Sequence, residues 1–459
     1  MKHQKQKRTK FKRQVKNTEN NWKIKATERA KIINQQKKRI LYLELSRDLL
    51  KDKYREGFLG SESLHFDSKT AKHHQYSLLV ILWVLQVQNY GAMSLLSYRH
   101  CVSSLYLVLN LSGRVPSHGS IRNWLCKQGI YRLQESSKCN KKRVLYVDES
   151  IILGGEKILL ILGISSDKIP SDGSVSHQDI EVLHVSSEKE WKAETIVPIL
   201  IKIGGMGDIS YIVSDQGCNL KKAYKLSQYV HIEDCTHILA NFLKRIYEKY
   251  PLFEAFQKLI GEVRKKWFLS KENSKFIPPS MRGKMRFANI FPCVEWAKKQ
   301  IDNWMNLGES NTKILSFLKE NQAFIEELVE QSKTFKMVCS ILKNKGYSEI
   351  QKTAIFKELP HHTKHENVRI FTDNIFVYVE NLTQKALYLG EKSILCSSDI
   401  IESFFGKFKQ KINPNCPHKL TEFMFTIANF SGNFNEDELQ KALENVQIKD
   451  LKKDRKSVV

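Results

Sequence analysis

Three acidic residues lie where their carboxylates could hold metal ions together: Asp148 in RVLYVDES, Asp215 in SYIVSDQG and Glu402 in SSDIIESFFGKFK. The first two follow apolar, β-branched runs that predict buried strands, and the third lies in an expected helix rich in Phe and Lys. Carboxylate oxygens are the ligands that Mg²⁺ or Mn²⁺ prefers. Two such ions about 4 Å apart could neutralise the attacking and leaving oxygens of a phosphoryl transfer, with Asp148 bridging both and each other acid completing one.

Each acid also has a purely structural reading. Asp148 could be a turn residue at a strand end, Asp215 could cap the helix that follows it, and Glu402 could form a capping box with Asp399. Asp399 lies nearly one helical turn before Glu402 and could reach the same face. Glu149 cannot share a site with its neighbour Asp148, because successive side chains of a strand point to opposite faces.

The elements around these acids follow the pattern of a mixed α/β domain: three strands, a helix, a strand, a helix and a strand. The expected strands cover residues 143–147, 158–164, 181–185, 209–214 and 229–232. Between Asp215 and Glu402 lie 186 residues, which is far more than a loop needs, and their apolar side chains recur at helical spacing. We therefore predict a mostly helical insertion over residues 250–390.

The charge of the chain predicts a polyanionic partner. Formal net charge is +25, and residues 1–56 alone hold 19 Lys or Arg against 6 Asp or Glu. This basic arm is expected to be helical from about Thr27 onward; a solvated charged helix without a specific partner is the alternative. Charge by itself does not distinguish DNA from RNA or an anionic membrane.

A short helix is expected after Pro116 in VPSHGSIRNWLCKQGIYRL, capped by Ser117 or Ser120 and ended by Gly129. A tight turn that leads into a helix with polar side chains facing outward is what a helix-turn-helix needs to read DNA. Any small helical domain can also contain such a turn, so a structural role without DNA contact is the alternative. The side chains predicted to contact DNA here are Arg122, Asn123 and Lys127.

Lysines that follow Glu402 form a second candidate DNA contact. Lys407, Lys409 and Lys411 lie within three turns of the same helix, where they could meet DNA phosphates beside the metal ions. A solvated basic face is the alternative.

The order and context of the acids resemble those of the DDE transposases and the integrases, and SFFGKFK after Glu402 fits the same pattern. The resemblance extends to Asp234-Cys235-Thr236-His237, which is similar to the Asp-x-x-His signature of Mutator-like transposases with helical insertions. It covers roughly residues 115–410. It implies an α/β ribonuclease H-like mixed sheet interrupted by a mostly α-helical insertion, with an α-helical N-terminal DNA-binding region. His237 would contact the scissile phosphate or orient a ligand.

The function that this resemblance implies is that of a DDE transposase. Such an enzyme cuts and joins double-stranded DNA at the ends of a mobile element, uses two Mg²⁺ or Mn²⁺ ions, and acts as a homo-oligomer. Two alternatives stay open: a nuclease of the same fold without strand transfer, and a domesticated DNA-binding protein without catalysis. The corresponding parts are a basic arm (1–56), a helix-turn-helix-like region (57–140), the first part of the core (141–249), the insertion (250–390), the closing helix (391–430) and a charged tail (431–459).

Cysteine usage and hydropathy predict an intracellular protein. The nine cysteines form no CxxC pair, which favours a reducing compartment, and the longest apolar run has eight residues, whereas a membrane span needs about 20. No apolar segment follows the basic start, as a secretory signal would require. We expect the cytoplasm or nucleoid of a bacterium, or a eukaryotic nucleus.

Overall fold

The computed structural model describes residues 69–91, 93–108, 114–138, 141–152, 155–170, 173–268, 276–280, 290–411, 422–447 and 449, and six isolated positions near the N-terminus. The chain divides into two compact units, Met1–His65 and Phe66–Val459. In the first unit the six described residues are helical and exposed. The rest of the predicted basic arm, residues 1–56, lies outside the described residues. The six positions are Ala30, Ile33, Asn34, Gln36, Lys37 and Arg39.

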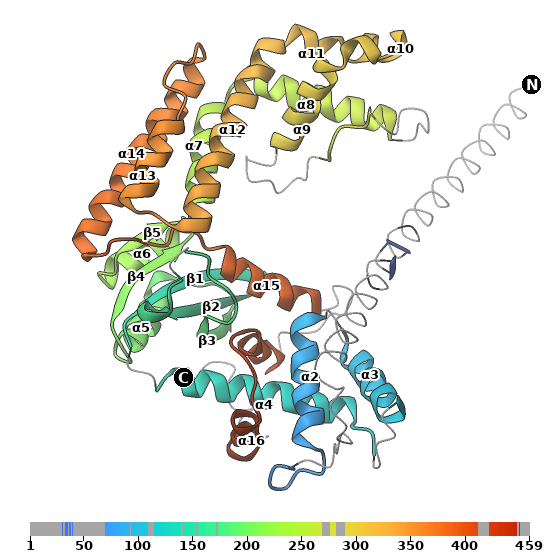
Figure 1. Ribbon diagram of the computed structural model, residues 1–459, viewed down its shortest axis with the longest axis vertical. Helices are drawn as coiled ribbons and strands as arrows, with labels where there is room; N and C mark the ends of the chain where they lie inside the picture. Colours follow the sequence, from blue (N-terminus) through green and yellow to red (C-terminus); the bar gives the residue numbers. More distant parts are fainter. Residues whose placement is uncertain are drawn as a thin grey trace, which may run out of the picture. The chain divides into compact units, whose positions relative to one another are not determined.

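The second unit contains a five-stranded mixed sheet (Figure 1). Its strands are β1 (Arg143–Ile152), β2 (Glu156–Ser165), β3 (Glu181–Glu188), β4 (Ile209–Ser214) and β5 (His231–Glu233), in the order β3-β2-β1-β4-β5. The first three are antiparallel neighbours, whereas β4 runs parallel to β1 and β5 parallel to β4. The prediction of a mixed α/β sheet is thereby confirmed.

The first strand is longer than predicted. We expected it to end at Val147, but β1 continues to Ile152 because its ladder with β2 remains paired as far as Ile152 and Glu156. Asp148 therefore lies within a strand and faces Leu160 across the ladder. Its interpretation as a turn residue at a strand end is wrong.

The sheet is covered on both faces, since alternate residues of its strands enter two different hydrophobic clusters. Helices α5 (Ala193–Gly204) and α6 (Cys218–Leu226) cover one face. Helices α4 (His118–Ser136), α7 (Cys235–Tyr247) and α15 (Asp399–Lys411) contribute to the cluster on the other. The α5 face buries Leu145, Val147, Leu159, Ile161 and Ile212, and the α15 face buries Val144, Tyr146, Leu160, Leu162 and Val213.

From α7 to the start of α15 every described element is helical, as predicted for residues 250–390. The longest members, α12 and α14, have 24 residues each, and α12 packs against α7, α9, α13 and α14. The helices are α8 (Pro251–Trp267), α9 (Phe291–Asp302), η5 (Trp304–Asn306), α10 (Glu309–Ile314), α11 (Ser316–Glu320), α12 (Gln322–Lys345), α13 (Glu349–Glu358) and α14 (Glu366–Leu389).

Helices from both ends of the second unit share a separate hydrophobic cluster. It joins α2 (Leu78–Tyr90), α3 (Leu95–Val108) and α4 to α16 (Glu436–Asn445), whose Leu439 and Leu443 are buried in it. Thus the described part of the predicted charged tail, 431–447, is not a solvated tail, because the apolar face of α16 packs on α2 and α4.

Gly129 does not end a helix. Helix α4 is capped by Ser117, as expected, but passes through Gly129 to Ser136. The glycine is needed because η6 (Glu422–Phe430) crosses at this point: a Cβ on Gly129 would lie 2.1 Å from the carbonyl oxygen of Phe425. The residue marks a close approach of backbones rather than a turn.

Candidate active site

The topology brings Asp148 and Asp215 to neighbouring strands of the sheet. Asp148 lies on β1, and Asp215 directly follows β4, the parallel neighbour of β1. Since Asp148 is two residues beyond Tyr146, its side chain lies on the sheet face that α15 covers. Glu402 belongs to the first turn of α15, and α15 packs against β1.

The environment of Asp148 raises the pKa of its carboxyl. Burial, which is the largest cause, and the negative charges of Asp215 and then Glu402 together raise this pKa from its ordinary value of 3.8 to about 7, against a hydrogen bond from the Glu149 N–H that lowers it. Carboxylates from two strands and a helix therefore repel one another across a half-buried site. A bound cation would relieve this repulsion.

Two of the carboxylates also make local backbone hydrogen bonds. The N–H of Glu149 donates to Asp148 Oδ1 at 2.8 Å, and the N–H of Gly217 donates to Asp215 Oδ1 at 2.9 Å. The second contact lies just before α6, so the structural reading of Asp215 as a residue that organises the start of that helix agrees with the geometry. Each contact uses one carboxylate oxygen.

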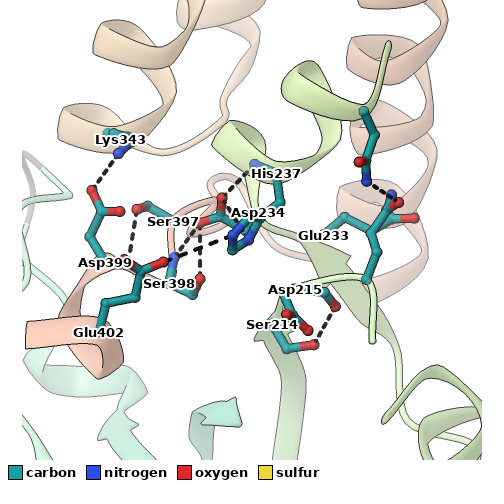
Figure 2. A network of polar contacts seen from close by, with 12 residues as sticks. Ser214, Asp215, Glu233, Asp234, His237, Lys343, Ser397, Ser398, Asp399 and Glu402 are labelled. Atoms are coloured by element: carbon teal, nitrogen blue, oxygen red, sulfur yellow. Dashed lines mark hydrogen bonds and ion pairs between the residues drawn. The ribbon is translucent and has the colours of Figure 1, made fainter. Parts of the chain in front are cut away.

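Histidine 237 lies beside Glu402. Its Nε2 is 3.9 Å from Glu402 Oε1, and its Nδ1 is 3.5 Å from Asp234 Oδ1, so that the imidazole stands between two carboxylates (Figure 2). The ring is held at this place because Asp234 caps α7 by accepting the N–H of His237 at 2.9 Å. The Asp-x-x-His spacing therefore has a structural reason: Asp234 caps α7, and His237 in the first turn of this helix lies beside Glu402.

The two neighbouring acids that could be mistaken for site residues are occupied elsewhere. Glu149 forms an ion pair with Lys157 of β2 at 3.1 Å, and Asp399 forms one with Lys343 of α12 at 2.6 Å (Figure 2). Through this ion pair the side chain of Asp399 ties α15 to the helical insertion.

The donor set of the site fits a divalent metal ion. Asp148, Asp215 and Glu402 supply hard oxygen ligands, and a cation bound by them would offset the negative charges of Asp215 and Glu402, which add to burial in raising the pKa of Asp148. Within the described part of the chain, no three His, Cys, Asp or Glu side chains already form a cluster that could hold an ion.

Lysines on α15 differ from the predicted outward row. Lys409 is exposed, with its ammonium 5.6 Å from the centre of the Phe405 ring. Lys411 instead turns inward, donates to the Gln88 carbonyl at 2.5 Å and lies over the Phe430 ring, and burial lowers the pKa of its amine to about 6. Lys407 is half-buried over the same ring. The prediction that Lys411 faces DNA is wrong, because η6 and α2 cover its end of the helix.

The predicted DNA-reading side chains of α4 do not form an outward row either. Lys127 is only 8% exposed and donates to the carbonyl of Leu443 at 2.6 Å, so that it caps the C-terminal end of α16. Arg122 forms an ion pair with Glu422 at 2.7 Å. Asn123 is half-buried and lines a cavity of about 650 Å³ between α4 and the end of α16. The outward orientation predicted for Lys127 is wrong.

His177 lies near the site but was not predicted from the sequence. His177, in the segment between β2 and β3, stacks on Phe404 with ring centres 4.5 Å apart and lies 2.9 Å from the hydroxyl of Ser403, next to Glu402. Its Nδ1 lies 3.1 Å from the Phe430 carbonyl, which can only accept, so Nδ1 carries the proton and Nε2 accepts from Ser403. A lone His in a loop offers no sequence signal for a contact 226 residues away.

Comparison with known proteins supplies no family for this arrangement. Neither a model of a known protein family nor a curated protein matches the chain.

Proposed function

We propose that this chain is a DDE transposase with a ribonuclease H-like core, which cuts and joins double-stranded DNA at the ends of a mobile element. The proposal is carried by the placement of three acids: Asp148 lies on β1, Asp215 directly follows the parallel neighbour β4, and Glu402 lies in the first turn of α15, which packs against β1. The strand order β3-β2-β1-β4-β5, with three antiparallel strands followed by two parallel ones, supports the same reading.

In the proposed site Asp148, Asp215 and Glu402 would hold two Mg²⁺ or Mn²⁺ ions. When bound, such ions neutralise the charge that develops on the attacking and leaving oxygens of phosphoryl transfer. His237 stands 3.9 Å from Glu402, where it could contact the scissile phosphate or hold Glu402 in place. No organic cofactor is part of the proposal.

Double-stranded DNA is the proposed partner because the chain has a net charge of +25 and exposes Lys409 seven residues after Glu402. Joining two element ends brings at least two protomers together, so a homo-oligomer belongs to the proposal. In the described residues no helix is both long and apolar enough to cross a membrane.

Cleavage of a plasmid that carries the gene with its flanking DNA tests this function. We expect cuts at the boundaries of the element with Mg²⁺ or Mn²⁺, and no cuts with Asp148→Asn or Glu402→Gln. Two matched controls, Glu149→Gln and Glu233→Gln, remove neighbouring carboxylates that pair with lysines outside the site, and should retain cleavage.

The other outcomes distinguish the alternatives. Metal-dependent cuts without joined products would indicate a nuclease of the same fold. Tight DNA binding with no cuts by any of the five proteins would indicate a DNA-binding protein without catalysis, and the transposase proposal would be abandoned.

A further inference from the structure

The segment that leads into the helix of Glu402 is fixed by hydrogen bonds at almost every residue. Residues 394–399 return the chain from the insertion to the sheet, and almost every one of them has an anchoring hydrogen bond to a distant element. The bonds are Tyr347 N–H to Ile394 O (2.8 Å), Ile394 N–H to Tyr347 O (3.0 Å), Leu395 N–H to Tyr211 Oη (2.8 Å), Cys235 N–H to Cys396 O (2.8 Å) and Lys343 Nζ to Asp399 Oδ2 (2.6 Å).

Asp234 makes one further anchoring contact, with Ser398, and also holds His237. It is only 1% exposed. Its Oδ1 accepts the N–H of His237 at 2.9 Å, while its Oδ2 accepts both the N–H of Ser398 at 2.7 Å and the hydroxyl of Ser398 at 3.0 Å (Figure 2). One buried carboxylate therefore joins the first turn of α7 to the start of α15.

We propose that Asp234 is the positioning residue of this site, which fixes Glu402 and His237 relative to each other; the inference rests on the proposed function. The physical reason is the number of donors: three converge on the two oxygens, and each carboxylate oxygen can accept two hydrogen bonds. Bonds to an ionised acceptor are shorter and stronger than neutral ones, and the N-terminus of α7 favours the negative charge. Ser398 directly precedes α15 and Glu402 lies four residues further on, in the first turn of this helix, so the contact between Asp234 and Ser398 also fixes the position of Glu402.

An amide cannot replace this carboxylate. In Asp234→Asn one oxygen becomes an NH₂ group, which would face either the N–H of His237 or the two donors of Ser398. The Asn side chain can therefore keep the hydrogen bond to α7 or the hydrogen bonds to the start of α15, but not both. Ser398→Ala is the milder variant, because it removes the hydroxyl donor and leaves the backbone N–H.

The matched control is Glu233→Gln, one residue earlier. Glu233 is also an acid at the end of β5, but it pairs with Lys385 at 2.8 Å and makes no contact with Ser398 among the interactions described here. It therefore changes the charge of the same strand end and leaves the proposed link intact.

Hydrogen exchange of the full-length, metal-free protein is the first readout, because it does not depend on activity. We expect Asp234→Asn to speed exchange about tenfold or more in peptides covering residues 235–240 or 396–402, and Ser398→Ala to speed it less, with Glu233→Gln like the wild type. Strand β1 should be unchanged in all of them. Wild-type exchange of both peptides in Asp234→Asn would overturn the proposal.

The second readout is the Mg²⁺ dependence of plasmid cleavage. Loss of an outer contact that orients a ligand typically weakens metal affinity about 10- to 100-fold, so the Mg²⁺ concentration for half-maximal cleavage should rise by that factor in Asp234→Asn. A purely structural role would lower the amount of active protein without moving this midpoint. An unchanged midpoint in a cleaving variant therefore refutes the positioning role.

The two proposals fail separately. If the wild-type protein does not cleave, the transposase function falls, while the exchange data still decide whether Asp234 couples α7 to α15. If the wild type cleaves and Asp234→Asn matches it in either readout, the positioning role alone falls.

Discussion

Replacing Asp148 by Asn should stabilise the metal-free protein at alkaline pH, although it should abolish cleavage. In the folded state burial, Asp215 and Glu402 raise the pKa of Asp148 from 3.8 to about 7. The unfolded chain can ionise this carboxyl above about pH 4, whereas the folded protein resists ionisation until about pH 7. The free energy of unfolding of the wild type therefore falls as the pH rises from about 4 to about 7 and stays low above this range. Asp148→Asn does not show this fall, because Asn cannot ionise.

The magnitude follows from the shift. A rise of about three pKa units at about 1.4 kcal/mol per unit gives about 4 kcal/mol as an upper value, and water that reaches the half-buried carboxyl reduces this, so we expect about 2–4 kcal/mol at about pH 8. At about pH 4 the difference between Asp148→Asn and the wild type should be near zero.

Urea unfolding in the presence of a chelator, at acidic and alkaline pH, measures this difference directly. Glu149→Gln is the control: its side chain pairs with Lys157 on the other face of the strand, so its variant should show no such gain. Added Mg²⁺ should then reduce this difference by about 2.7 kcal/mol, because a ligand at about 100 times its Kd adds about that much to the stability of the wild type alone. A stability difference for Asp148→Asn that does not change with pH would refute the convergence of the three acids.

Three further outcomes are expected. Gly129→Ala should lower the free energy of unfolding by about 1–3 kcal/mol or more, because its Cβ would meet backbone, whereas Gly261→Ala, with open space around it on α8, should raise it by up to about 1 kcal/mol; thermal unfolding compares the two variants. Burial lowers the pKa of His177 to about 4, so denaturant titrations should show the wild type losing stability as the pH falls from about 6.5 toward 4, and His177→Gln losing less. In salt titrations of DNA binding, Lys409→Ala should reduce the slope by about one counterion, whereas Lys411→Met should leave it unchanged.

Side-chain alternation is why the acids could be found from the sequence. Along β1 the buried residues alternate between two clusters, so Asp148 and Glu149 had to face opposite sides of the sheet, and only one of them could join Asp215. Helical periodicity was equally informative over residues 250–390, because the longer helices there, α8, α9, α12 and α14, each bury a stripe of apolar side chains.

The polar faces of helices could not be predicted in this way. Lys127 and Lys411 look like solvated cations in the sequence, yet each caps or contacts backbone from a segment about 320 residues away. Periodicity shows which face of a helix is apolar, but it does not show whether a later segment will cover the polar face. The same limit applies to Gly129: a glycine is needed there because the carbonyl of Phe425 lies close to it, and not because the helix ends in a turn.

The helical insertion is part of the fold of the core rather than an appendage to it. β5 is the last strand of the sheet and only three residues long, so its outer edge needs cover. Helix α14 supplies it: the hydroxyl of Tyr378 donates to the Glu233 carbonyl at 3.0 Å, and Lys385 pairs with the Glu233 carboxylate at 2.8 Å. The chain then returns toward α15, and just before this helix the carbonyl of Cys396 accepts the N–H of Cys235 at 2.8 Å, close to where the chain left the sheet. Because the insertion closes both the edge of the sheet and the path to Glu402, its removal should expose β5 and release the third acid together.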